Sequence, residues 1–181
     1  MRSGSSKSTA DRRQSLGKRI ASFSVIIWLC GVGSATAVPN PNCLAGEWID
    51  DVIAFVVEET GSSVPMVCLS RATSDVLQSL VATEGNHDIL AAVFVPARRE
   101  ILLADDLDLG APLGRSYLVH ELVHAQQFAG GSNERARCPG ALESDAYGVQ
   151  ALYLRRHNLT TDAFLLQVLG MLQSACGRSN Y

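Results

Sequence analysis

The sequence predicts an α+β fold, a single domain in which a small sheet packs on a central helix and further helices follow. Apolar residues recur at helical spacing in four segments, at 45–60, around 117–124, at 141–154 and at 163–175. Two short apolar runs, 91–95 and 100–104, are separated by four residues, as the strands of a hairpin are. The order of helices, strands and again helices favours α+β over an alternating α/β arrangement.

The first part of the domain is expected to contain a helix, a strand and a second helix. After a Pro-rich lead-in at Val38–Asn42, the wide apolar side of Ala45–Thr60 predicts a helix that ends at a Gly-Ser-Ser turn. Val64–Leu69 is then expected to be a strand. Thr73 or Ser74 can cap a helix that runs to about Thr83.

The hairpin and the loop after it lead into the central helix. Ala91–Val95 and Glu100–Ala104 are expected to be strands joined by Pro96–Arg99. Asp105–Gly114 is polar, contains Gly and Pro, and is expected to be a loop. The central helix should end at Gly130-Gly131.

The last part of the chain is expected to be helical. Gly131–Gly140 predicts a loop and Ala141–Leu154 a helix. Thr160–Asp162 then starts a final, Leu-rich helix over Ala163–Ala175. With no internal repeat or low-complexity linker, these elements form one domain, in which the small sheet lies over the central helix.

The central helix carries the most informative motif, because His120–His124 has the pattern H-E-x-x-H. Residues four apart share one face of a helix, so the two imidazoles can bind one cation. Glu121 borders the same face and can reach a water bound to that cation without being a ligand. Two neutral nitrogen ligands, an open coordination position and a carboxylate base are typical of zinc hydrolases.

A catalytic zinc site usually has three protein ligands, so a third is needed. The chain after His124 offers Glu134, Cys138, Glu143, Asp145 and His157. Glu143 is favoured, because it opens the predicted helix at 141–154 on a stripe that also holds Ala146, Tyr147, Gln150 and Leu154. A small residue at Ala146 would let the two helices approach closely. A carboxylate that only complements the helix dipole is the alternative for Glu143.

The segment from Arg115 to Arg156 resembles the gluzincin group of zinc metallopeptidases. It carries HELVHAQQ, a short loop and then ALESDAYGVQALYL, and is most similar to the compact bacterial members of the group. The resemblance implies a zincin-like fold, zinc ligands His120, His124 and Glu143, and Glu121 as general base. It also implies that the hairpin supplies an edge strand for an extended peptide, as sheet edges can.

The resemblance has one departure. Larger gluzincins carry an Asp four residues after the ligand Glu, and here that position is Tyr147. The partner that orients a ligand imidazole must therefore differ, with Tyr147 or Asp145 as substitutes, while packing in the core is the other role for Tyr147. Candidates for stabilising an oxyanion are Tyr117, Tyr147, His157 and Arg137.

The expected function is an exported zinc-dependent hydrolase, foremost a metallopeptidase acting on a peptide or protein. Three alternatives stay open: a non-catalytic module in which zinc joins two helices, a zinc hydrolase of a non-peptide amide or ester, and an ordinary amphipathic helix at 117–124. A closed fourth coordination position would favour the structural module.

Residues 1–37 are expected to be a signal peptide. A basic stretch, the short apolar run Ala21–Val32 and the small-x-small pattern Ala35-Thr36-Ala37 predict cleavage near Ala37 and a secreted or periplasmic protein. An uncleaved anchor is the alternative, and only then would a membrane be a partner. The mature chain, 38–181, holds nine arginines, no lysine and 17 acidic residues, a formal charge of −8 that argues against a nucleic-acid partner.

Four cysteines follow the signal segment, an even number that suggests two disulfides in an exported chain. Cys43–Cys68 with Cys138–Cys176 is the preferred pairing, because each bridge then joins neighbouring elements. Free thiols are the alternative.

Overall fold

The computed structural model describes residues 43–81 and 90–175, all of which belong to one compact unit of the chain. The expected signal segment 1–37 and its cleavage position lie outside the described residues, as does Cys176. Within the described part of the chain, no helix is both long and apolar enough to cross a membrane.

The sheet has three strands in the order β1-β3-β2, where β1 is Cys68–Ala72, β2 is Ala92–Val95 and β3 is Glu100–Ala104. The predicted hairpin is confirmed, because β2 and β3 pair antiparallel with Phe94 opposite Ile101. The first strand was expected at Val64–Leu69, which is wrong. It begins later, at Cys68, because it pairs parallel with β3 from Cys68 opposite Glu100 onward.

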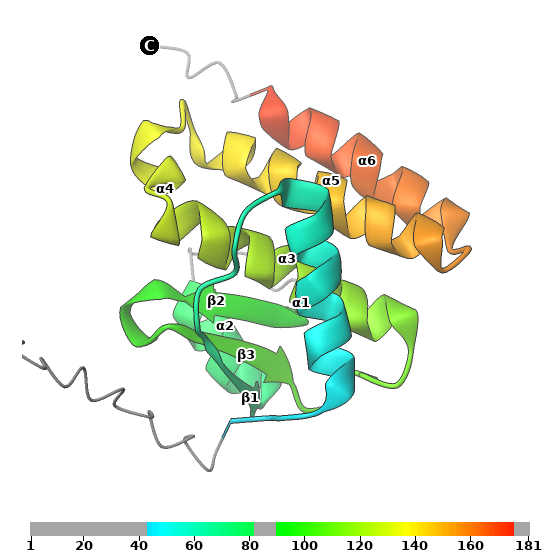
Figure 1. The fold of residues 1–181 in the computed structure, drawn as a ribbon. Coiled ribbons are helices and arrows are strands. Elements are labelled where there is room, and N and C mark those ends of the chain that lie inside the picture. The colour runs from blue at the N-terminus through cyan, green and yellow to red at the C-terminus, as the bar shows by residue number, and fades with distance from the viewer. Residues whose placement is uncertain (1–42, 82–89, 176–181) are drawn as a thin grey trace, which may run out of the picture. The chain divides into compact units, whose positions relative to one another are not determined.

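The described residues also form six α-helices, which together with the sheet confirm the mixed α+β class (Figure 1). They are α1 (Glu47–Thr60), α2 (Ser74–Val81), α3 (Pro112–Ala129), the short α4 (Ser132–Arg135), α5 (Pro139–Arg156) and α6 (Thr160–Ser174). A 3-10 turn, Pro96–Arg98, joins the two strands of the hairpin. Thr73 caps α2, since its hydroxyl accepts the N–H of Val76 at 3.4 Å.

Both long helices of the candidate site begin earlier than expected, each with a proline in its first turn. Pro112 starts α3 and Pro139 starts α5, where the missing N–H costs no hydrogen bond. The loop expected at Gly131–Gly140 therefore contains α4 and ends sooner. Glu143 consequently lies beyond the first turn of α5, where a helix dipole acts less on a carboxylate.

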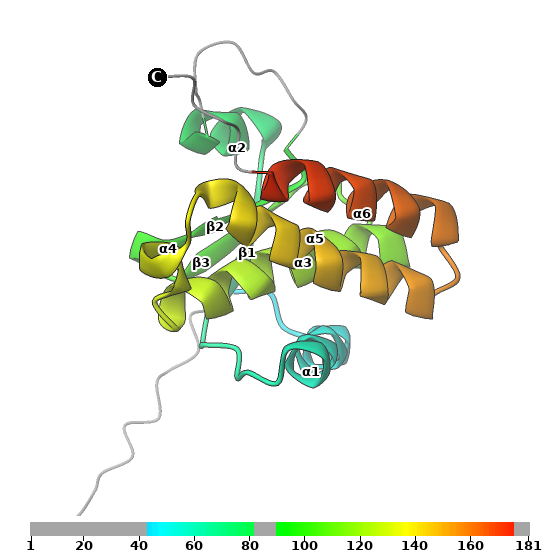
Figure 2. The ribbon, with the colours of Figure 1, turned by 90° about the horizontal axis from the view of Figure 1, so that it is seen from above.

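The sheet is covered on both faces, which positions α3. Ile101 and Leu103 of β3 point to the main core with Leu118 and Leu122 of α3. Leu102, between them on β3, points to the other face, where it packs with Ala72 of β1, Ala104 of β3 and Leu77 of α2. α1 and α2 accordingly lie on opposite sides of the sheet (Figure 2). Figure 1 shows α3 running between the sheet and α5.

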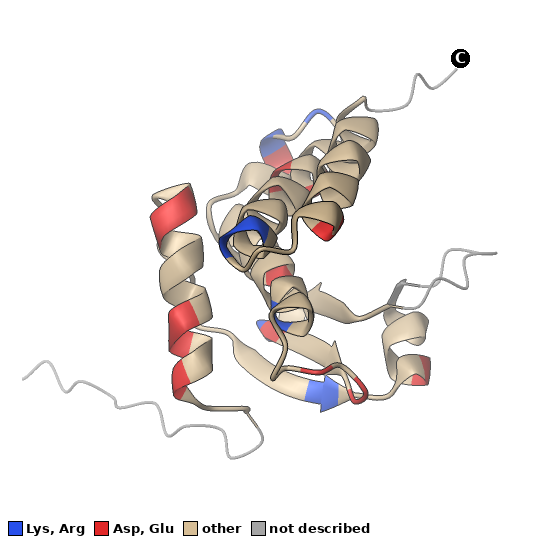
Figure 3. Cartoon of the chain, turned by 90° about the vertical axis from the view of Figure 1, so that its right-hand side faces the viewer, with Lys and Arg blue, Asp and Glu red and all other residues tan. Residues whose placement is uncertain are grey.

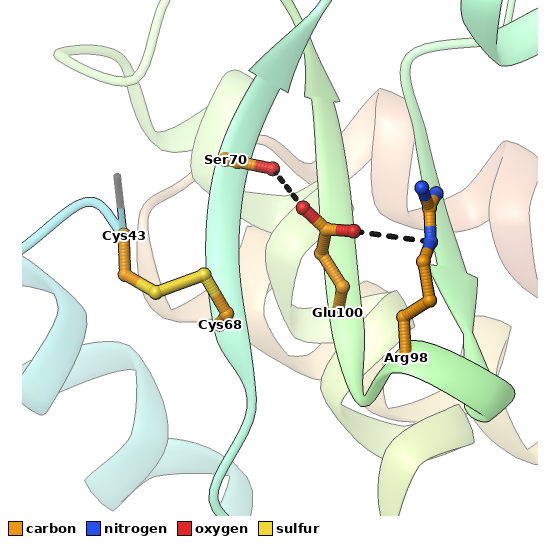
Figure 4. The surroundings of a disulfide bond; sticks show 5 residues. All are labelled: Cys43, Cys68, Ser70, Arg98 and Glu100. Carbon is orange, nitrogen blue, oxygen red and sulfur yellow. Dashed lines mark hydrogen bonds and ion pairs between the residues drawn. A yellow bond between two sulfur atoms is a disulfide. The ribbon is translucent and has the colours of Figure 1, made fainter. Parts of the chain in front are cut away.

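The segment before α1 is attached to the outer edge of the sheet. Cys43 and Cys68 form the expected disulfide, and the N–H of Leu44 donates to the carbonyl of Leu69 at 2.7 Å. Figure 4 shows this bridge beside the hydrogen bond of 2.6 Å from Ser70 to Glu100. Arg98 forms an ion pair with the same Glu100 carboxylate at 3.2 Å.

Cys138 is also disulfide-bonded. Its expected partner, Cys176, lies outside the described residues, so the preferred pairing stays a prediction. Cys138 directly precedes α5, the helix that carries Glu143.

Candidate metal site

Two histidines of α3 and one glutamate of α5 bring their side chains to a common point. The Nε2 atoms of His120 and His124 lie 3.1 Å apart. The two carboxylate oxygens of Glu143 contact one nitrogen each, with Oε2 3.3 Å from His120 and Oε1 3.3 Å from His124. The three potential ligand atoms lie within 4.8 Å of one another, so this group could hold a metal ion.

Gln150 determines which nitrogen of His120 carries a proton. The hydroxyl of Ser116 donates to the carbonyl of Leu113 at 2.7 Å, so its oxygen accepts the Gln150 Nε2–H at 3.0 Å. The amide oxygen of Gln150 is thereby turned to Nδ1 of His120, 3.1 Å away. A carbonyl oxygen only accepts, so Nδ1 is the protonated nitrogen and Nε2 keeps its lone pair.

Gln127 does the same for His124. Its Nε2–H donates to the backbone carbonyl of Leu142 on α5 at 2.9 Å, which fixes the orientation of the amide. Its oxygen then accepts from Nδ1 of His124 at 2.8 Å. In their neutral forms both imidazoles therefore direct an unprotonated Nε2 to the common point, as a pair of neutral metal ligands must.

Two lone pairs that face each other at 3.1 Å repel, and a cation between them removes the repulsion. Burial alone would lower the pKa of His124, but the hydrogen bond to Glu143 and the nearby carboxylates raise it. The metal-free site thus attracts a proton. Two neutral imidazoles and one carboxylate are also a donor set that Zn²⁺ takes in catalytic sites, so the residues fit that ion.

Glu143 is held in its ionised form. Burial by itself would raise the pKa of this half-buried carboxyl, but its contacts with His120 and His124 outweigh burial and hold the pKa far below the usual range. An anionic oxygen is the form in which a carboxylate binds a metal.

Glu121 lies beside this group and is buried, with only 8% of its surface exposed. One of its carboxylate oxygens accepts the backbone N–H of Phe94 on β2 at 2.7 Å. Burial raises the pKa of Glu121, although the two histidines and the Phe94 hydrogen bond act in the opposite direction. A raised pKa makes a carboxylate a better base near neutral pH.

The group opens into a cleft of about 660 Å³ between the sheet edge, α3, α5 and α6. Among the described residues that line it, the acidic ones are Glu121 and Glu143, and none is a Lys or Arg. Most of the lining is apolar: Leu90, Ala91, Ala92, Val93, Phe94, Pro96, Phe128, Pro139, Leu142, Leu166 and Leu169.

The other residues considered from the sequence fall in different places. Tyr117 and Tyr147 line the cleft, and the Tyr147 ring lies 4.6 Å from the His120 ring. His157 instead packs against Tyr153, with the ring centroids 4.5 Å apart and the rings tilted by 51°, and Arg137 is not among the lining residues. Two of the four oxyanion candidates therefore border the cleft.

The alternative ligands do not join the group. Glu134 and Asp145 are exposed, and Cys138 is disulfide-bonded. Asp145 therefore does not orient a ligand histidine, and the partner of His120 Nδ1 is Gln150, not Tyr147.

Sequence reasoning gave no role to the residues that orient the imidazoles, which are Gln127, Gln150 and Ser116. Gln150 offered one signal in the sequence, because it is a polar residue on the same stripe as Glu143 and Ala146. The structure shows that it is buried. Gln127 lies three residues after His124 on the same helix, which is the spacing of side chains in contact.

The chain belongs to a family described as a domain of unknown function (DUF6647), whose model matches residues 40–181. No curated protein and no solved structure matches it.

Proposed function

We propose that this member of the DUF6647 family is a zinc-dependent hydrolase, and within that class a metallopeptidase. The observation that carries the proposal is the convergence of the His120 and His124 Nε2 atoms and the Glu143 carboxylate beside the buried Glu121. His120, His124 and Glu143 would hold the ion, which leaves a fourth position open toward the cleft.

When bound, zinc would lower the pKa of a coordinated water to about 7 and would polarise a substrate carbonyl. Glu121 would accept the proton of the attacking water, because its raised pKa and its place beside the ligands suit a general base. The Phe94 N–H holds one oxygen of Glu121, so the other oxygen is the one for proton transfer.

A peptide is the substrate that best suits the cleft. β2 is an edge strand of the sheet, and its residues Ala92, Val93 and Phe94 line the cleft beside the candidate ligands. An edge strand can pair with an extended peptide through backbone hydrogen bonds. Tyr147 and Tyr117 are the hydroxyl groups suited to stabilise charge on the scissile carbonyl.

Export is part of the proposal. The Cys43–Cys68 disulfide supports an oxidising compartment, since such bonds are rare in reducing cytosol. Together with the expected cleavage near Ala37, it favours a secreted or periplasmic enzyme.

The test of the ligand set compares two carboxylates of α5. Glu143→Ala should weaken zinc binding, measured by calorimetry, by more than about 100-fold, since even an outer partner of a ligand accounts for 10–100-fold. Asp145→Ala, two residues on and exposed, is the matched control and should bind zinc like the wild type. Equal zinc affinity in both variants would refute the ligand set.

The test of catalysis uses the zinc-loaded, disulfide-intact mature protein on a mixed peptide library. Glu121→Gln should retain zinc and lose about 10²–10⁴ in rate. Zinc binding without hydrolysis of any peptide would instead favour the non-catalytic module, and hydrolysis of amide or ester probes alone would favour the non-peptide hydrolase.

A further inference from the structure

α6 is apolar around most of its circumference and yet packs mainly on a single neighbour, α5. Only Ala163 and Gly170 of this helix are buried. Five large apolar side chains are between 37% and 68% exposed and form what we call the α6 outer face: Phe164, Leu165, Leu169, Met171 and Leu172. A helix that is apolar on all sides is normally covered, and a contiguous exposed apolar patch marks a binding surface.

The charge of α6 restricts the class of partner. Asp162 is its only charged residue, and the helix is mostly tan in Figure 3, the colour of residues without charge. Helices that lie on membranes usually carry Lys and Arg on their polar side, and α6 has neither. An uncharged, apolar partner complements this face better than a lipid headgroup or a charged protein surface.

The α6 outer face is continuous with the candidate site. Leu169 belongs to the α6 outer face and also lines the cleft. Leu166, one turn earlier, lines the cleft as well. Leu165 and Leu172 lie four residues before and three after Leu169, so they are its neighbours on the helix surface. The apolar surface therefore runs from the cleft out over α6 without a charged residue between.

We propose that the α6 outer face binds an apolar segment of the same polypeptide whose scissile region occupies the cleft. This inference rests on the proposed function for the part of the substrate in the cleft. One ligand that leaves the cleft meets Leu169 first and then Leu165 or Leu172. α6 has 15 residues and is about 22 Å long, a distance that about seven extended residues span.

The lining of the cleft points to an internal segment of the substrate. No Lys or Arg among the described lining residues could pair with a terminal carboxylate, and both lining acids belong to the candidate site. The substrate class is thus a long polypeptide with an apolar stretch beside the cleaved bond.

The experiment measures peptide binding to the full mature chain carrying Glu121→Gln, which should not cleave its ligand. Two fluorescent peptides share one central sequence, and the longer one adds about seven apolar residues. Fluorescence anisotropy should give a Kd about tenfold lower for the longer peptide. Leu165→Ser with Leu172→Ser should abolish this difference, and Phe164→Ser, tested separately, should reduce it.

Met66→Ser is the matched control, because Met66 is 82% exposed and is not a lining residue of the cleft. It should keep the tenfold difference. Thermal unfolding of each variant checks the fold, which these exposed positions should leave intact.

Three results would overturn the inference. In the first, the variant with Leu165→Ser and Leu172→Ser, here called the α6 variant, binds the longer peptide as tightly as the Glu121→Gln parent does. In the second, light scattering shows that the parent is a dimer and the α6 variant is not, which would make a second copy of the chain the partner. In the third, phosphatidylcholine vesicles bind the parent but not the α6 variant, which would make a lipid surface the partner. Failure of the proposed function would look different. The longer peptide would still bind more tightly through α6, but the zinc-loaded wild type would hydrolyse no peptide.

Discussion

Gln150 of α5 accepts a hydrogen bond of 3.1 Å from Nδ1 of His120 on α3, so the two helices that carry the proposed ligands are joined through a ligand's own ring. The amide is itself oriented by Ser116, whose hydroxyl has its proton committed to Leu113. The protonation of the first histidine is therefore set by a chain of hydrogen bonds that ends at a backbone carbonyl.

Gln150→Leu should reduce zinc affinity by about 10–100-fold, because His120 loses the partner that fixes its tautomer and orientation. Nitrogen NMR of the metal-free protein should show the proton of His120 on Nδ1 in the wild type and a mixture of tautomers in the variant. Gln126→Leu is the control, since Gln126 bonds Thr60 and Ser62 away from the site. An unchanged tautomer and affinity in the Gln150 variant would contradict this role.

Glu121→Gln should change how stability depends on pH in the metal-free protein. Burial raises the folded-state pKa of Glu121 above its ordinary value of 4.5, so the wild type is destabilised as pH rises from about 4.5 through the folded pKa. The variant cannot ionise and escapes this loss. The difference in unfolding free energy, variant minus wild type, should therefore grow between pH 4 and pH 8 in urea titrations.

Asp145→Asn is the control for that series, because it removes an exposed carboxylate from α5. Its difference from the wild type gives the effect of removing an exposed carboxylate, against which the Glu121→Gln series is compared. A flat difference for Glu121→Gln would mean that its carboxyl is no more costly to ionise in the folded chain than in the unfolded one.

Gly140→Ala should destabilise the protein by about 1–3 kcal/mol. A Cβ on this residue would overlap the backbone oxygen of Gln173 near the end of α6, so α6 could no longer lie as close to the start of α5. Gly148→Ala, also on α5, has no atom within 4 Å of its new Cβ and should stabilise the helix by about 0.5–1 kcal/mol. Thermal unfolding of the two variants would separate close packing from helix propensity, and equal shifts would count against a tight α5–α6 contact.

Cys43→Ser with Cys68→Ser should lower the unfolding free energy by about 3 kcal/mol, as expected for a bridge between residues 25 apart in sequence. The double variant keeps both positions small and removes the tether between the segment before α1 and β1. Urea unfolding of oxidised wild type and variant gives the value, and a loss below about 0.5 kcal/mol would show that the hydrogen bond from Leu44 to Leu69 suffices to hold this segment.

Most elements of the fold could be predicted from the sequence, because each follows from a local pattern. The hairpin of β2 and β3 and the helices α1, α3, α5 and α6 show clear apolar periods or strand runs. β1 was misplaced because its position depends on pairing with β3, about 30 residues later, and its polar Ser70 and Arg71 hide the strand. Ser70 bonds Glu100 and Arg71 bonds the Ala104 carbonyl, neither of which a local pattern reveals.

The three proposed ligands could be predicted from the sequence, because residue spacing along a helix determines which side chains share a face. The residues that orient them could not, because their contacts depend on how the helices pack. The four-residue spacing places His120 and His124 on one face, and a helix with Glu143 on its inner stripe brings the third group. The roles of Gln127 and Gln150 depend on how closely α3 and α5 approach, since Gln127 bonds the Leu142 carbonyl across that contact. A glutamine amide can both donate and accept hydrogen bonds, so its role can be assigned only once its neighbours are known.

Each edge of the sheet has one backbone group already taken up, in a different way on each side, and this bears on self-association. The outer edge of β1 is occupied at Leu69 by the chain before α1, while on β2 the N–H of Phe94 is taken up by the Glu121 carboxylate. Unpaired edge strands recruit other chains into sheets and so into aggregates, and a buried charge beside an edge opposes this. Position 121 is therefore expected to oppose aggregation in addition to its proposed role as a base. An acceptor at this position would protect the edge of β2 whether or not the proposed activity is present.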